Sequence, residues 1–108
     1  MRLKAGVKLT DLKPQMALGA VIVRDVYAAL DPSCSCTVTS ANDSKHSDGS
    51  LHYYGRALDF RTHDFSADKA MLRAKVKEAL GDEFDVVLEG VGTPNEHLHV
   101  EYEGDRRK

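Results

Sequence analysis

Apolar side chains recur at helical spacing between residues 10 and 30, where those from Leu18 onward fall three or four positions apart. This periodicity predicts one amphipathic helix. Thr10 is a suitable N-cap for it, and Pro14 is tolerated in a first helical turn. We expect the helix to end near Asp31, which precedes a proline.

A second helix is predicted between residues 66 and 81. Ser66 is a suitable N-cap, and Asp68 is favourable beside the positive end of a helix dipole. Leu72 and Val76 belong to an apolar stripe, and Gly81 follows it as a typical helix terminator.

Alternating apolar and polar residues, or short β-branched runs, predict four strands. The segments are residues 36–39, 55–62, 84–89 and 97–102. The last is the clearest, because its polar positions are His97, His99 and Glu101 while the residues between them are apolar. These elements predict an α+β fold, in which a small, mostly antiparallel sheet has helices on one face.

Length and charge narrow the classes of protein. A chain of 108 residues predicts a single domain, residues 1–108, with its core at about 10–103. Fifteen Lys and Arg against seventeen Asp and Glu give a formal charge of -2. This balance disfavours nucleic acid as a partner, because phosphate binding needs a basic field. The longest apolar run, residues 16–23, is too short to insert into a membrane.

The first residues contain no apolar segment of the length that a signal peptide needs. We therefore expect synthesis in the cytoplasm, and action on an outside substrate would require release or a trimmed signal. The two cysteines, Cys34 and Cys36, are too few for a disulfide scaffold or a thiolate metal site. Ordinary small residues beside a strand are the simpler interpretation, and a redox or metal role is the alternative.

The histidines favour a metal site. All five lie between positions 46 and 99, and the polar faces of two predicted strands carry Asp59 and the pair His97 and His99. Two imidazoles and one carboxylate are a ligand set of catalytic zinc, which keeps a position for water. His52, Asp59 and His99 would serve as that set. The alternative is that exposed strand faces are polar in any case.

Two further residues bear on this hypothesis. His52 and Asp59 are seven positions apart, which on one regular strand would put them on opposite faces, but Gly55 permits a bend between them. Glu96 lies three residues before His99, where a carboxylate can act as a general base toward a metal-activated water. The alternative for Glu96 is a solvated turn residue.

Two segments together resemble a known superfamily. They are SLHYYGRALD at residues 50–59 and EHLHV at residues 96–100. The pair resembles zinc D-alanyl-D-alanine carboxypeptidases and related bacterial and phage peptidoglycan peptidases, whose pattern is Ser-x-His-x-x-Gly-x-Ala-x-Asp followed by Glu/Asp-x-x-His. In its amino-acid sequence the first segment is most similar to the hedgehog N-terminal signalling domain, which shares that fold and zinc site. The resemblance covers roughly residues 16–103.

The resemblance implies roles residue by residue. It implies one catalytic Zn²⁺ held by His52, Asp59 and His99 in a cleft on the sheet face opposite the helices. Glu96 matches the catalytic base. His97 and His46 match histidines that line the site and stabilise the oxyanion.

The same resemblance suggests substrate-binding roles for Ser50 and Tyr53. His63 matches no family position, and a surface role is expected for it. The family also uses an arginine to grip its substrate, and neither Arg24 nor Arg56 can be chosen for that role from the sequence.

Two departures from the hedgehog pattern affect the expected function. The loop after residue 39 offers Ser40, Asp43 and Asp48 but lacks a run of carboxylates, so calcium is not expected. Hedgehog domains keep a glutamate near the position of Thr93, whereas Glu96 follows the peptidase pattern. We therefore expect a zinc metallopeptidase, D-alanyl-D-alanine carboxypeptidase-like, that acts as a monomer on peptidoglycan stem peptides at a D,D, L,D or cross-bridge bond. The alternative is a hedgehog-like, zinc-containing binding module without hydrolytic activity.

Overall fold

The computed structural model describes residues 1–41 and 55–104. Its strands form one five-stranded sheet in the order β1-β2-β3-β5-β4. The strands are β1 (Arg2–Leu3), β2 (Thr37–Ser40), β3 (Ala57–Arg61), β4 (Phe84–Glu89) and β5 (His97–Tyr102). Strands β1 and β2 are parallel, and the other three pairings are antiparallel. The α+β prediction is confirmed, and the sheet is mixed.

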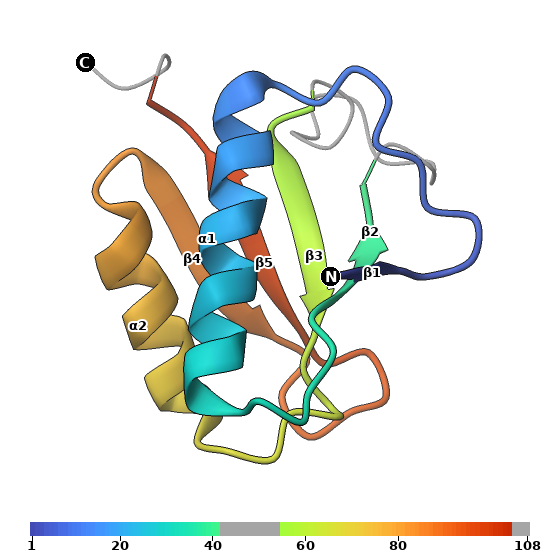
Figure 1. Ribbon diagram of the computed structural model, residues 1–108, viewed down its shortest axis with the longest axis vertical. Coiled ribbons are helices and arrows are strands. Elements are labelled where there is room, and N and C mark those ends of the chain that lie inside the picture. Colours follow the sequence, from blue (N-terminus) through green and yellow to red (C-terminus); the bar gives the residue numbers. More distant parts are fainter. Residues whose placement is uncertain (42–54, 105–108) are drawn as a thin grey trace.

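Helices α1 (Pro14–Leu30) and α2 (Lys69–Leu80) lie side by side on one face of the sheet (Figure 1). The strand faces that they cover are apolar, and Leu58, Phe60, Leu98 and Val100 are fully buried there. Alternate residues of β3 and β5 point to the opposite face, which these helices leave uncovered. The polar residues that the sequence placed on one strand face therefore share this open face of the sheet.

Helix α1 begins later than the sequence pattern predicted. Its N-cap is Lys13, which makes no side-chain capping bond, and Pro14 is the first helical residue. The expected cap at Thr10 is wrong because the residue before a proline is driven into extended backbone, and Lys13 has a ψ of 143°. The predicted end is confirmed, since the helix ends at Leu30 with Asp31 as C-cap.

Helix α2 has a different cap from the expected one. The Asp68 side chain accepts hydrogen bonds from the backbone N–H groups of Ala70 and Met71, so Asp68 is the N-cap. Ser66 instead donates through its backbone N and its hydroxyl to Asp31 at the end of α1. The cap prediction failed because Ser66 has a tertiary partner that the local sequence does not reveal.

Gly55 supports the turn that leads into β3. Its φ is 69°, and a Cβ there would lie 2.1 Å from the backbone oxygen of Asp11. The Gly55 carbonyl also accepts a hydrogen bond from the Lys13 N–H. A glycine is therefore required at this position both for the backbone conformation and for close approach to the segment before α1.

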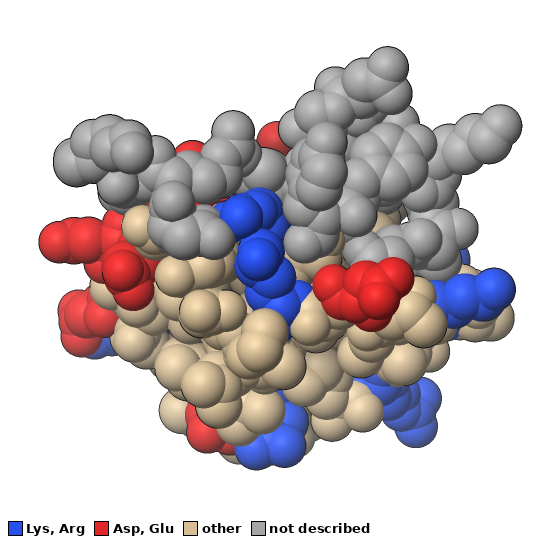
Figure 2. Space-filling model, turned by 90° about the horizontal axis from the view of Figure 1, so that it is seen from above, with Lys and Arg blue, Asp and Glu red and all other residues tan. Residues whose placement is uncertain are grey.

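The described surface carries both signs of charge. Figure 2 shows blue and red groups separated by other residues, with no continuous basic patch on the described part of that face. Within residues 1–41 and 55–104, neither helix is long and apolar enough to cross a membrane.

Candidate functional site

Strand pairing brings Asp59 and His99 together. The two residues are 40 positions apart in the chain and are register partners on β3 and β5. Both side chains point to the open face, and Asp59 Oδ1 lies 2.7 Å from His99 Nδ1. Two of the three zinc ligands predicted from the sequence are therefore direct neighbours on two adjacent inner strands of the sheet.

The second nitrogen of His99 is also held. Its Nε2 lies 2.5 Å from an oxygen of Glu101, the next residue on the same face of β5. Burial alone would lower the pKa of His99, but the hydrogen bonds to Asp59 and Glu101 outweigh it and raise the pKa to about 9. Metal-bound histidines commonly donate their other ring N–H to a carboxylate, which is the part Glu101 would have here.

His97 lies on the same face, one pleat further along β5. Its Nδ1 is 2.6 Å from the Asn95 carbonyl oxygen, and its Nε2 is 2.9 Å from Glu89 and 3.8 Å from Asp59. Burial acts to lower the pKa of His97, and these acceptors together raise it. The acceptors around the His97 ring therefore favour its protonated, positively charged form beside the Asp59 carboxylate.

Zinc fits the donors of this cluster. Asp59 and His99 supply one carboxylate oxygen and one imidazole nitrogen in contact, which are donor types that zinc takes. Glu101 would fix the orientation of the His99 ring.

Four candidate residues lie outside the described residues. They are His46, Ser50, His52 and Tyr53. The third predicted ligand and one of the predicted oxyanion-stabilising histidines therefore remain sequence predictions.

Glu96 is buried and already has partners. Its Oε1 lies 2.7 Å from the Thr62 hydroxyl and 2.5 Å from the Lys69 ammonium at the start of α2. Its Oε2 accepts a hydrogen bond of 3.2 Å from the backbone N–H of Gly92. The Lys69 bond is the main cause that holds the pKa of Glu96 at about 2, against its burial. Glu96 is therefore no solvated turn residue, and it joins α2 to the β4–β5 connection.

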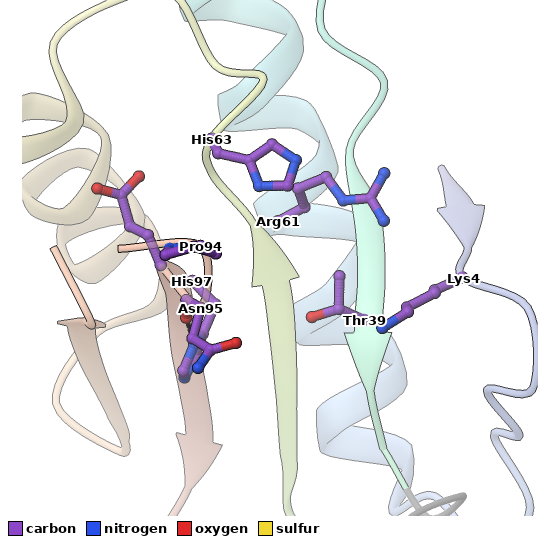
Figure 3. A pocket seen from close by; sticks show the side chains of 8 residues that line it. Lys4, Thr39, Arg61, His63, Pro94, Asn95 and His97 are labelled. Atoms are coloured by element: carbon purple, nitrogen blue, oxygen red, sulfur yellow. Dashed lines mark hydrogen bonds between the residues drawn. The ribbon is translucent and has the colours of Figure 1, made fainter. Parts of the chain in front are cut away.

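A pocket of about 430 Å³ adjoins His97 on the open face. Figure 3 shows its lining: Arg61 and His63 come from β3 and the residues after it, Lys4 reaches in from the N-terminal segment, and Asn95 and His97 lie across from them. Glu96 is the one carboxylate among the described lining residues. His63 was expected to be an ordinary surface residue, and it is exposed but lines this pocket.

Further groups on this side of the sheet were not singled out from the sequence. One carboxylate oxygen from each of Asp85, Glu101 and Glu103 lies within 4.8 Å of the others, so this group could hold a metal ion. Asp85 and Glu101 are register partners on β4 and β5. Strand alternation predicts which sheet face Asp85 and Glu101 occupy. Only the pairing of β4 with β5 shows that their carboxylates lie close together.

The cysteines are free thiols. Burial raises the pKa of Cys34 to about 11 and that of Cys36 to about 12. Neither thiol is activated as a nucleophile, because the thiolate is the reactive form. This agrees with their interpretation as ordinary residues beside β2.

Comparison with known proteins gives one family. The sequence model of the hedgehog amino-terminal signalling domain matches residues 10–100. No curated protein and no solved structure matches the chain. The matched range includes Asp59, His97 and His99.

Proposed function

Since the chain belongs to the hedgehog amino-terminal signalling domain family, we propose that it binds one zinc ion on the open sheet face and hydrolyses a peptide bond there. The contact between Asp59 and His99 carries this proposal. The proposed ligands are His52, Asp59 and His99, and the proposed substrate is a peptidoglycan stem peptide, cut at a D,D, L,D or cross-bridge bond.

Zinc at this site would act as a Lewis acid toward the peptide carbonyl and would activate a water molecule. The protein's own groups then have separate tasks. The His97 ring, beside Asp59, would stabilise negative charge that develops on the carbonyl oxygen, as proposed also for His46. The pocket beside His97 gives the rest of the peptide a place to bind.

Glu96 is the proposed base, and its contacts set a condition on that role. A carboxylate with a pKa near 2 is a weak proton acceptor, so Glu96 would have to exchange Lys69 for the substrate water before it could act. Glu96 and His97 both line the pocket, but the Glu96 carboxylate contacts Lys69 of α2 and the buried Thr62 hydroxyl. The exchange would therefore also require the Glu96 side chain to turn toward the open face.

The same contacts favour a second candidate function. A Glu96 that stays paired with Lys69 leaves the site without a base, and the domain would then recognise a partner without cutting it. Membership in a signalling-domain family is compatible with such a binding module.

Product analysis separates the two candidates. Zinc-loaded protein and its Glu96→Gln variant are incubated with a panel of stem peptides, and products are identified by mass spectrometry. Cleavage by the wild type but not by Glu96→Gln supports the peptidase. The variant is first shown to be folded by circular dichroism, because Glu96 also holds Lys69 and Thr62.

A second variant tests the ion pair between Glu96 and Lys69. Lys69→Met keeps the Glu96 carboxylate and removes its cation, so it tests whether the ion pair limits the base. No cleavage of any peptide by zinc-loaded wild type and by Lys69→Met would contradict the peptidase and favour the binding module.

The proposed substrate also implies where the domain would act. The domain would act as a monomer at the cell wall after release or removal of a signal. The formal charge of -2 supports a partner other than nucleic acid.

A further inference from the structure

Within residues 1–41 and 55–104, the sheet ends in two edge strands of unequal length. At one edge, β1 contributes only Arg2 and Leu3. At the other, β4 runs from Phe84 to Glu89 and has β5 as its neighbour. The outward N–H and C=O groups of an edge strand are a template on which another strand can form hydrogen bonds. The edge at β4 therefore offers a second chain the most backbone to pair with.

The hydrogen-bond pattern of β4 shows which of its backbone groups face outward. In an antiparallel pair, residues that bond to the neighbouring strand alternate with residues that do not. Just before β4, the Glu83 oxygen accepts a hydrogen bond of 2.8 Å from the Glu103 N–H. Bonding to β5 therefore continues at every second residue after Glu83. The residues between them direct their backbone N–H and C=O groups to the outer edge, and these are Phe84, Val86 and Leu88.

Two cations of α2 bind carbonyl groups of this outer edge. The Lys77 ammonium donates to the Phe84 oxygen at 2.5 Å and to the Gly81 oxygen at 3.2 Å. The Arg73 guanidinium donates to the Val86 oxygen at 3.4 Å. An added strand would lie about 4.8 Å from β4 on this side. Both cationic groups therefore occupy space that an added strand would need.

The two cations belong to one stripe of α2. Lys69, Arg73 and Lys77 follow one another at intervals of four residues, so they lie on the same side of the helix. Lys69 pairs with Glu96 in the β4–β5 connection, and Figure 1 shows α2 beside β4. Lys75 lies off this stripe and is exposed. The stripe therefore follows the β4 side of the sheet, from the connection after β4 back to its first residue.

We infer that Arg73 and Lys77 prevent the outer edge of β4 from pairing with β4 of a second copy of this chain. A second strand could reach the outward carbonyls only by displacing both cations. It would replace hydrogen bonds from charged donors, which are the stronger kind, with bonds from neutral N–H groups. Charged side chains at an edge are a common means by which natural sheets avoid such pairing. Neither zinc nor hydrolysis enters into this role of α2.

Among possible occupants of the edge, β4 itself fits well. Antiparallel pairing centred on Val86 brings the outward backbone groups of two copies together. In that register Phe84 lies opposite Leu88 of the other copy, so two apolar side chains meet. Asp85 lies opposite Val87 of the other copy. Since no like charges oppose each other within residues 84–88, removal of the two cations should let the chain associate with itself.

The test compares the oligomeric state of the wild type with that of Arg73→Met/Lys77→Met. Methionine keeps an unbranched apolar stem and removes the charge and the donors. Sedimentation velocity is recorded over a wide range of protein concentration, without zinc or substrate. We expect the double variant to dimerise at concentrations at least ten times lower than any at which the wild type does.

A matched control removes the same kinds of charge elsewhere. Arg24→Met/Lys75→Met replaces one arginine on α1, which pairs with Asp25, and one exposed lysine on α2. Both double variants change the net charge equally and add two methionines, so general repulsion and stickiness are matched. The control should behave as the wild type does.

Amide hydrogen exchange locates the contact. The N–H groups of Val86 and Leu88 should exchange more slowly as the double variant dimerises, because they point outward from β4. If circular dichroism shows the double variant to be unfolded, Arg73→Met alone takes its place, since Arg73 is exposed and its loss uncovers the Val86 carbonyl.

Three outcomes would overturn the inference. The first is a folded edge variant that associates no more than the wild type. The second is equal association of the matched control. The third is a dimer in which exchange slows at another surface and not at Val86 and Leu88. Since the test needs neither zinc nor cleavage, its failure is distinct from failure of the proposed peptidase.

Discussion

Asp31 joins the end of α1 to the segment before α2 through one carboxylate. Its Oδ1 accepts from the Ser33 hydroxyl at 2.7 Å, and its Oδ2 accepts from the Ser66 hydroxyl at 2.8 Å and backbone N–H at 2.9 Å. The Ser33 bond, together with those from Ser66, lowers the pKa of Asp31 to about 2. A single side chain thereby links the C-terminal end of α1 to the segment that precedes α2.

Asp31→Asn should lower stability at neutral pH, because the amide NH₂ cannot accept a hydrogen bond. The folded-state pKa lies below the usual value of 3.8, so the stabilisation is present above about pH 4 and is lost as the pH falls toward 2. Urea unfolding at several pH values should show the difference between wild type and variant shrinking as the pH falls from about 4 toward 2. Asp25→Asn on the exposed side of α1 is the control, and a difference between wild type and Asp31→Asn that does not depend on pH would contradict this account.

Glu96 gives a second prediction for a single residue. Replacing it by alanine removes acceptors from Thr62, Lys69 and the Gly92 N–H. We expect the free energy of unfolding to fall by about 1.5–3 kcal/mol, the range for hydrogen bonds to charged groups. Glu89→Ala, at a side chain that is 49% exposed, should change it little in the same urea titration. Equal effects of the two variants would show that the Glu96 contacts do not stabilise the fold.

At the scale of elements, the turn at Gly55 connects the start of β3 to the segment before α1. The carbonyl of this glycine accepts from Lys13, and the residue has no room for a side chain. The site depends on this contact, because Asp59 follows four residues later on the same strand.

Gly55→Ala should destabilise the protein by more than a backbone penalty alone. The added Cβ would meet the Asp11 oxygen at 2.1 Å, in addition to the cost of a positive φ. Gly6→Ala is the matched control, since Gly6 has a φ of 90° and a Cβ added there would have nothing within 4 Å. Thermal melting should show a larger loss for Gly55→Ala than for Gly6→Ala, and equal losses would contradict the steric account.

The elements were largely predictable from sequence because their signals are local. Strand alternation gave β4 and β5 at their observed bounds, and Gly81 follows α2 as expected. The errors at Thr10 and Ser66 arose where a proline or a distant carboxylate decided the cap. The contact of Asp59 with His99 and the role of Arg61 in a pocket wall depend on the strand order, which no local pattern encodes. The ligand role of His52 stays a prediction, because this residue lies outside the described ranges.

At the scale of the whole molecule, the helices bury one face of the sheet and leave the other to the polar cluster. The packing that stabilises the domain and the chemistry proposed for it are therefore on opposite faces. A ligand that binds only the folded form links the two, because it shifts the folding equilibrium by mass action.

Zinc should raise the melting temperature of the wild type. With free zinc at 100 times its dissociation constant, the expected stabilisation is about 2.7 kcal/mol. Asp59→Ala and His99→Ala should lose this effect, and His63→Ala should keep it, because His63 lies in the neighbouring pocket. Melting curves recorded with zinc and after its removal give this shift in melting temperature. An unchanged shift in His99→Ala would exclude His99 as a ligand.

The position of β5 in the sheet also determines when the protein can fold during synthesis. In the chain β5 follows β3 and β4, yet in the sheet it lies between them and pairs with both. A nascent chain on the ribosome that has released residues only up to β4 has no strand to join β3 to β4, and Asp59 has no His99 beside it. The open face is therefore completed by the same late event that closes the sheet, after residue 102 has left the ribosome.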